Sequence, residues 1–365
     1  MAYLTRLLSS AALAATAALA VSACAPASAP PAAAKTGTAS TSAAPALTIA
    51  DARRAFASYV SASARATARG NRAAALALTE GVQWDEVKAD FLRAGHNLAK
   101  LPRYRYGSPV FYLPDQSDYP QWFVADAPRS TVNATADAGT LAGLSLPASG
   151  HVLMLFEKAT AASPWLLASS AQLAPGESVP KLAAANGYVA DASTTDTSLL
   201  ARPDVAGALQ AAVVDDGPAS AASRVVANGP LTTGLHAAQA ALAPAQTPRG
   251  DNHFWALDGS NFTKFALRTA DGGELVFYTM YLDTTTEVPA EYTDSYPVLP
   301  GPKITVPAEF APLLTPGTPA PRVQLITQLT LAFAAVDPPA GEAKIQVIAI
   351  GGGPNHVSAS LAGGA

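Results

Sequence analysis

From Thr48 onward the chain has enough large apolar residues to form a core, and there the apolar and polar residues first follow the spacing of a helix. One apolar face recurs at helical intervals between Thr48 and Gly70, and Gly70 ends the pattern. Thr48 and Asp51 have the spacing of a capping box, with Asp in place of the preferred Glu or Gln. Two further helices are predicted over 72–79 and 84–98.

Beyond these helices the pattern changes to the two-residue alternation of β-strands. Strands are predicted over 103–113, 121–127, 151–158 and 165–173. The last two are close enough to form a hairpin, and a Gly-, Pro-, Ser- and Ala-rich excursion at 128–149 precedes them. The first unit is therefore predicted to contain three helices followed by about four strands.

The same order of elements recurs after a stretch rich in Pro, Gly and small polar residues. Helices are predicted over 204–214, 219–226 and 232–242. The predicted strands that follow cover 252–257, 262–269, 274–283, 323–336 and 343–350. Asp271-Gly272-Gly273 is a turn signal between two of them, a Pro-rich excursion occupies 288–322, and the last two strands should form a hairpin.

We infer an α+β fold class with two tandem units, each with N-terminal helices packed on a curved antiparallel sheet. The predicted organisation is a signal peptide at 1–23, a disordered Ala/Pro/Ser/Thr tether at 24–47, a first domain at 48–174, a connector at 175–203, a second domain at 204–353 and a flexible tail at 354–365. The alternative is that the two halves are not duplicates and share the same order of elements by chance, because many α+β domains begin with helices. In element order each unit resembles the cone-shaped nuclear-transport-factor-like fold.

The first residues have the three parts of a secretory signal. Arg6 is the only charge before Cys24, and Leu7–Val21 is an uncharged run too short for a stable membrane span. Val21-Ser22-Ala23-Cys24 resembles the lipobox of bacterial prolipoproteins, in which the cysteine is acylated, with palmitate for example, and becomes the first residue. This resemblance implies lipidation of Cys24 and an anchor on the extracytoplasmic face of the cell membrane. An ordinary signal with a chance cysteine is the alternative.

The whole chain resembles uncharacterised lipoproteins of high-GC Gram-positive bacteria, grouped as a domain of unknown function. Three features carry this resemblance: the signal ending at Cys24, the Ala-Arg-Arg-Ala-Phe-Ala-Ser-Tyr helix at 52–59, and the segment 102–109 with its Tyr-Arg-Tyr-Gly. The resemblance implies no activity.

Charge and composition exclude several classes of partner. Removing residues 1–23 leaves 22 basic and 27 acidic residues, a net charge of −5, which gives no electrostatic basis for binding nucleic acid. The same balance provides no polybasic patch for anionic lipid. Cys24 is the single cysteine, so the folded part has no disulfide and depends on burial for its stability.

No catalytic motif in the sequence keeps its required context. Ser178 and Lys181 have the Ser-x-x-Lys spacing of penicillin-binding enzymes, but Pro180 lies inside the turn that should be helical. The Gly351–Gly353 run is followed by neither Gly-Lys-Ser/Thr nor a helix, and it is predicted to be a flexible exit from the last strand. The five histidines show no metal-ligand spacing, so we predict neither a metal nor a cofactor.

The richest local feature is an aromatic stretch from Tyr104 to Phe123. On a curved sheet its alternate members can line a concave pocket, for which the candidate residues are Tyr104, Tyr106, Trp122, Asp126 and His151. Packing in the core or at the sheet edge is the competing interpretation. We predict a non-enzymatic lipoprotein that binds an envelope protein, a polymer or a small apolar ligand. The alternative is an enzyme of the pocketed-cone type, in which a tyrosine works with Asp126 or His151 as acid and base.

Overall fold

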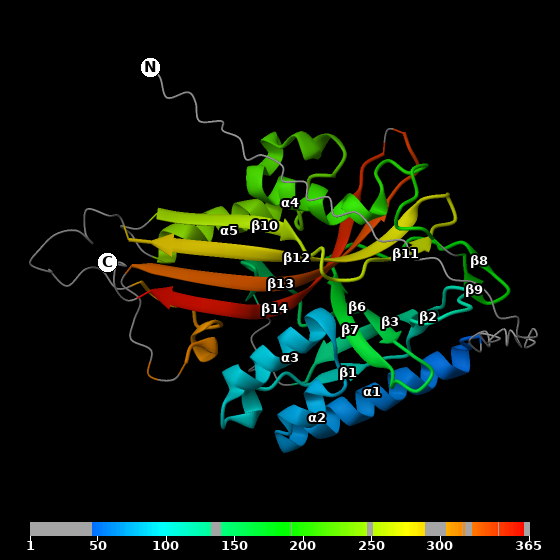
Figure 1. The fold of residues 1–365 in the computed structure, drawn as a ribbon, viewed down its shortest axis with the longest axis horizontal. Coiled ribbons are helices and arrows are strands. Elements are labelled where there is room, and N and C mark those ends of the chain that lie inside the picture. Colours follow the sequence, from blue (N-terminus) through cyan, green and yellow to red (C-terminus); the bar gives the residue numbers. More distant parts are fainter. Residues whose placement is uncertain are drawn as a thin grey trace, which may run out of the picture. The chain divides into compact units, whose positions relative to one another are not determined.

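The computed structural model describes residues 46–132, 140–190, 192–246, 251–288, 304–315, 317, 323–341 and 343–360. The signal segment, Cys24 and most of the predicted tether lie outside the described residues. Figure 1 shows the helices and strands with the labels used below.

The three predicted N-terminal helices are present. The first has nearly the predicted bounds, whereas the third begins and ends a few residues earlier than predicted. They are α1 (Ile49–Arg69), α2 (Arg72–Leu76) and α3 (Gly81–Ala94), followed by the short 3-10 helix η1 (Leu98–Lys100). The capping box is present, since the Thr48 side chain accepts from Asp51 N and the Asp51 side chain accepts from Thr48 N. Gly70 ends α1 with φ 64°, a conformation that favours glycine.

The first half of the chain then forms a set of antiparallel strands. They are β1 (Tyr104–Tyr106), β2 (Val110–Tyr112), β3 (Gln121–Thr131), β6 (Ser149–Lys158) and β7 (Leu166–Leu173), with the small pairs β4 (Thr140–Leu141) and β5 (Leu144–Ser145), and β8 (Ala184–Ala185) and β9 (Tyr188–Val189). The predicted hairpin of β6 and β7 is confirmed. β3 runs to Thr131 and so includes the first residues of the predicted excursion at 128–149.

The second half repeats helices followed by strands. Its helices are α4 (Ala206–Asp216), α5 (Thr233–Gln246) and the 3-10 helices η2 (Pro203–Val205), η3 (Gly217–Ala219), η4 (Ala221–Arg224) and η5 (Ala311–Leu313). Its strands are β10 (Asp251–Asp258), β11 (Phe265–Arg268), β12 (Glu274–Glu287), β13 (Gln324–Asp337) and β14 (Gln346–Ser360). The predicted terminal hairpin is confirmed as β13 and β14. Because β14 continues to Ser360, residues 354–360 belong to a strand and not to a flexible tail.

The α+β class is confirmed, but strands from both halves join one ten-stranded antiparallel sheet. Its order is β1-β3-β6-β7-β14-β13-β12-β10, with β2 on β3 and β11 on β12. Only two residue pairs, Leu173 with Ala349 and Gln172 with Ile350, join β7 to β14. The two tandem units are therefore not confirmed as separate bodies.

The apolar cores also cross the boundary between the halves. One cluster packs Phe56 of α1 against Phe123 and Phe156 of the first-half strands. A second cluster, on the opposite face, contains Leu155 from the first half and Phe277 from the second. A third lies under α4 and α5 against β12, β13 and β14. Burial shared between the halves explains why they fold together in one compact unit.

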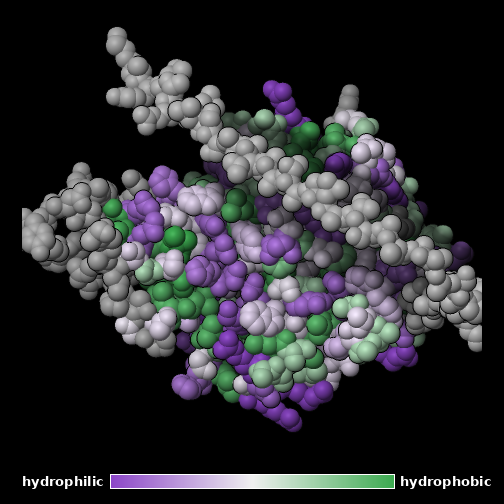
Figure 2. Space-filling model, viewed as in Figure 1, coloured by the Kyte–Doolittle hydropathy of each residue, from purple (hydrophilic) through white to green (hydrophobic). Residues whose placement is uncertain are grey.

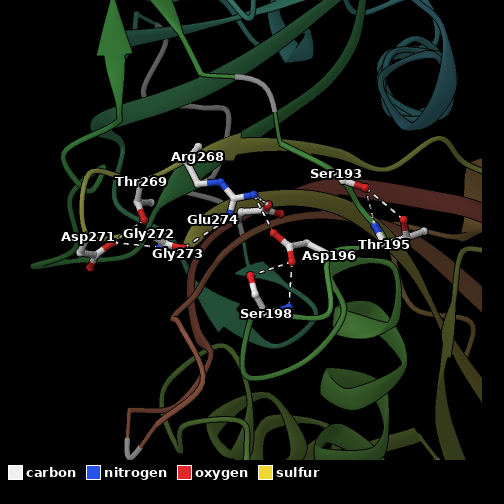
Figure 3. Close-up of polar contacts among 10 residues, drawn as sticks. All are labelled: Ser193, Thr195, Asp196, Ser198, Arg268, Thr269, Asp271, Gly272, Gly273 and Glu274. Carbon is white, nitrogen blue, oxygen red and sulfur yellow. Dashed lines mark hydrogen bonds and ion pairs between the residues drawn. The ribbon is translucent and has the colours of Figure 1, made fainter.

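The predicted connector is tied to the second half by polar contacts (Figure 3). Asp196 accepts from Arg268 at 2.7 Å, and Arg268 also lies 3.0 Å from the buried Glu274. Ser198 donates its hydroxyl to Asp196 at 2.7 Å. The predicted turn at 271–273 lies directly beside this group, with Gly272 at φ 92°. Residues 193–198 are therefore packed on the β11–β12 turn.

The Gly351–Gly353 run lies inside β14 and corrects the prediction of a flexible exit. A Cβ on Gly351 would stand 1.8 Å from the Ser170 carbonyl oxygen, and one on Gly352 would stand 2.1 Å from the Thr330 carbonyl oxygen. β14 therefore passes so closely over its neighbours here that only glycine fits. This crossing lies next to the two-pair junction of β7 and β14, where β6 and β7 leave the row of β12–β14 (Figure 1).

Candidate functional site

A cleft of about 620 Å³ opens beside this junction of the two halves of the sheet. Its walls come from α3, β1, β3 and β7 in the first half and from α5, η5, β12, β13 and β14 in the second. The glycines at 351–353 form part of the wall. A smaller cavity of about 130 Å³ adjoins it, since Glu86, Asp90 and Tyr104 line both.

Arg129 of β3 is the central cation of the cleft. Its Nη2 donates to Gln172 Oε1 at 2.8 Å, and its guanidinium lies 4.5 Å from the centre of the Tyr104 ring. Gln172 is itself fixed, because its Nε2 donates to the Pro147 carbonyl at 2.8 Å. No carboxylate among the described residues lies within ion-pairing distance of Arg129, so its charge is balanced only at longer range.

Two carboxylates one helical turn apart on α3 face the same cleft. Burial and the neighbouring charge of Asp90 together raise the pKa of Glu86 to about 7, against the opposing effect of Arg129. Burial also raises the pKa of Asp90, although Asp90 forms an ion pair with Arg93. Gln83 donates to Glu86 Oε2 at 2.9 Å. Near neutral pH, Glu86 therefore exchanges between a charged and a neutral form.

Three tyrosines surround these charges. Burial raises the pKa values of Tyr59, Tyr104 and Tyr106 above the ordinary range. Their hydroxyls therefore remain protonated at neutral pH and are able to donate hydrogen bonds, but not to act as bases.

The opposite side of the cleft, from the second half, is largely apolar. The apolar side chains lining it include Leu242, Leu282, Phe310, Leu329 and Ile350. Thr284 and Thr327, which pair across β12 and β13, add hydroxyls to this wall. A pocket with one charged wall and one apolar wall suits an amphipathic organic ligand.

The sheet separates the five predicted pocket residues into two groups. Tyr106 pairs with Arg129 and Tyr104 with Thr131, so both tyrosines share the α1-facing side of β3 with the cleft. Asp126 and Trp122 alternate with those positions along β3 and lie on the opposite side, as does His151, which pairs with Pro128. The predicted pocket of all five residues is therefore not formed.

His151 and Asp126 do come together, but away from the tyrosines. His151 Nδ1 lies 2.7 Å from Asp126 Oδ1, with the imidazole half-exposed. Trp122 packs on Phe265 of β11, with the ring centres 4.9 Å apart, in the core between the halves. Because side chains alternate between the two faces of the sheet, Tyr104 and Tyr106 cannot form the predicted acid–base pair with Asp126 or His151.

Sequence reasoning missed Arg129, Glu86, Asp90 and Gln172. Arg129 falls within the excursion predicted at 128–149, although it continues the alternation of β3. The Glu86 and Asp90 spacing was a usable signal, since residues four apart share one face of a helix. No group of three or more His, Cys, Asp or Glu in the described part of the chain is arranged to hold a metal.

Comparison with known protein families matches residues 43–353 to a domain of unknown function (DUF8094), and the chain belongs to this family. A relative described as an uncharacterized lipoprotein, from Streptomyces avermitilis, is 25% identical over 241 residues. That match covers 64% of this chain and 65% of the relative, just under two thirds of each. These findings confirm the resemblance to uncharacterised lipoproteins.

No solved structure matches the chain, so the likeness to the nuclear-transport-factor-like fold stays a prediction. None of the helices in the described ranges has the length and apolar character needed to span a membrane.

Proposed function

We propose that the protein is a lipoprotein held to the extracytoplasmic face of the cell membrane by lipid on Cys24, and that it binds a ligand in the cleft between the two halves of its sheet. The role is binding without catalysis. The observation that carries this proposal is the cleft itself, with a charged wall from α3 and β3 and an apolar wall from β12–β14.

The distribution of apolar residues on the surface favours binding in a cleft over docking of a partner on a broad apolar face. Figure 2 shows hydrophilic and hydrophobic residues interspersed on the side it presents. The exposed large apolar residues are distributed over several elements: Ile49, Trp84, Val110, Val132, Val205, Leu242, Trp255 and Leu257. Single exposed apolar side chains are normal in soluble domains and need no partner.

Anchoring is supported by the lipobox sequence at 21–24 and by the relative described as a lipoprotein. Two or three acyl chains on one cysteine hold a protein firmly to a bilayer, because each buried CH₂ contributes about 0.8 kcal/mol. Such an anchor would confine the cleft to ligands of the envelope.

Filling the cleft tests the binding role. Thr284→Trp places a large ring in the cleft, whereas Tyr281→Trp changes the same strand on its other face. The protein extracted from the membranes of its own cells should carry a bound small molecule in native mass spectrometry. Thr284→Trp should lose that molecule and Tyr281→Trp should keep it. Equal retention by both variants would show that the ligand binds elsewhere, and a wild-type protein without any bound molecule would count against the role.

A further inference from the structure

We propose that the Arg129 end of the cleft binds an oxyanion, either a carboxylate or a phosphate-type group, carried by the ligand, and that this binding is accompanied by proton uptake at Glu86. The inference rests on the proposed function and names the chemical class that the cleft selects.

The geometry around Arg129 is that of a prepared anion site. A guanidinium has five N–H donors in a planar fork that matches the two oxygens of a carboxylate or phosphate. Gln172 holds one end of this fork at 2.8 Å, and stacking on Tyr104 fixes its plane. The side chain is thereby oriented before the ligand arrives, and it lines the open cleft.

The other charges around the cleft add to this preference. Lys100 and Arg93 also line it, while its acids are Glu86, Asp90 and Glu309. Asp90 is already engaged with Arg93, which leaves Arg129 and Lys100 to attract an anion. The Tyr106 hydroxyl oxygen accepts a hydrogen bond from Arg129, and the neutral hydroxyls of Tyr104 and Tyr106 keep their protons for donation to a bound anion.

Glu86 links the site to pH through its surroundings on every packed element. It faces Asp90 and Arg93 on α3, Arg129 on β3, Tyr104 and Tyr106 on β1, and Tyr59 on α1. An anion bound at Arg129 would repel the charged form of Glu86 and favour the neutral form, which can donate a hydrogen bond. Since the pKa of Glu86 is about 7 without ligand, binding should tighten as the pH falls from 8 to 6.

Titration with simple anions tests the proposal. Sulfate and acetate keep constant charge between pH 6 and 8, and they distinguish a tetrahedral from a planar anion site. Their binding to the full chain in detergent is measured by calorimetry and by thermal unfolding, with sodium chloride holding ionic strength constant. Wild type should bind at least one of them, roughly threefold or more tightly at pH 6 than at pH 8.

Four variants separate the claims. Arg129→Met should weaken anion binding about tenfold or more, because a hydrogen bond to a charged group is lost. Arg129→Lys should restore part of it. Arg105→Met, which removes an exposed guanidinium from the other face of β1, should leave it unchanged. Glu86→Gln should abolish the pH dependence while keeping the binding.

The experiments distinguish failure of the anion site from failure of the proposed binding function. Equal anion binding by wild type and Arg129→Met, or no anion binding by wild type, would overturn the anion site. If a cleft ligand is nevertheless lost in Thr284→Trp, the cleft binds a ligand that is not recognised through an oxyanion. If Arg129→Met does not fold, Arg129→Lys and Arg129→Gln provide the comparison. If the binding of anions by Glu86→Gln still depends on pH, Glu86 is not the group that takes up the proton. The anion site at Arg129 would be unaffected by that result.

Discussion

Gly351→Ala should open the junction between the two halves of the sheet. The new methyl would stand 1.8 Å from the Ser170 carbonyl oxygen, whereas real Cβ contacts are essentially never shorter than 3.0 Å. The backbone of β14 must therefore move by more than about 1 Å, next to a junction that consists of two residue pairs. Overpacking of this kind costs about 1–3 kcal/mol, and each hydrogen bond lost adds about 1 kcal/mol. We expect a total destabilisation of about 3 kcal/mol or more.

Gly353→Ala is the matched control two residues along the same strand. Its methyl would lie 3.6 Å from Glu86 Cγ, an ordinary contact, so the expected change is within about 1 kcal/mol. Guanidinium unfolding followed by fluorescence of the four tryptophans measures both variants. Equal midpoints for Gly351→Ala and Gly353→Ala would refute the reasoning that the crossing of β14 over β7 admits only glycine.

Three further substitutions test other parts of the account. Cys24→Ala should move the protein from the detergent phase to the aqueous phase in phase partitioning, and an unmodified Cys24 mass in membrane-bound wild type would contradict lipidation. Burial raises the pKa of Asp337 to about 6, so the folded state loses stability as the pH rises from about 4 through 6. Asp337→Asn should therefore stabilise the protein by about 2 kcal/mol at pH 8 and much less at pH 4, and equal gains at both pH values would exclude this cause. Thr48→Ala removes the α1 cap and should cost about 1 kcal/mol in thermal or chemical unfolding, whereas an unchanged midpoint would show that the cap is dispensable.

Local signals in the sequence were sufficient for most elements of the fold. The capping box at Thr48 and the glycine at Gly70 act within one helical turn, and both hairpins follow from alternation over adjacent segments. The pairing of β7 with β14 could not be predicted in this way, since Leu173 and Ala349 are far apart in the chain and their contact is set by shared burial. That one non-local pairing converts the two expected units into a single sheet.

The candidate site was harder to predict than the fold because it depends on which face each residue occupies. The aromatic stretch indicates Tyr104 and Tyr106 correctly, but the partners predicted for them, Asp126 and His151, lie on the other face of the sheet. Arg129 became recognisable only once β3 was known to continue past Pro128 and to pair with β1. Strand length and pairing register, which a single sequence specifies weakly, therefore determined the site.

Amide hydrogen exchange of the protein after removal of any bound small molecule, with and without an extract of its own cell envelope, tests the cleft most directly. The account predicts slower exchange at 170–172 and 351–353, where β7 and β14 line the cleft, and unchanged exchange in α1 remote from it, at 49–55. Unchanged exchange throughout, or slowing confined to segments outside the cleft, would contradict the claim that the protein binds its ligand at the junction of the two halves.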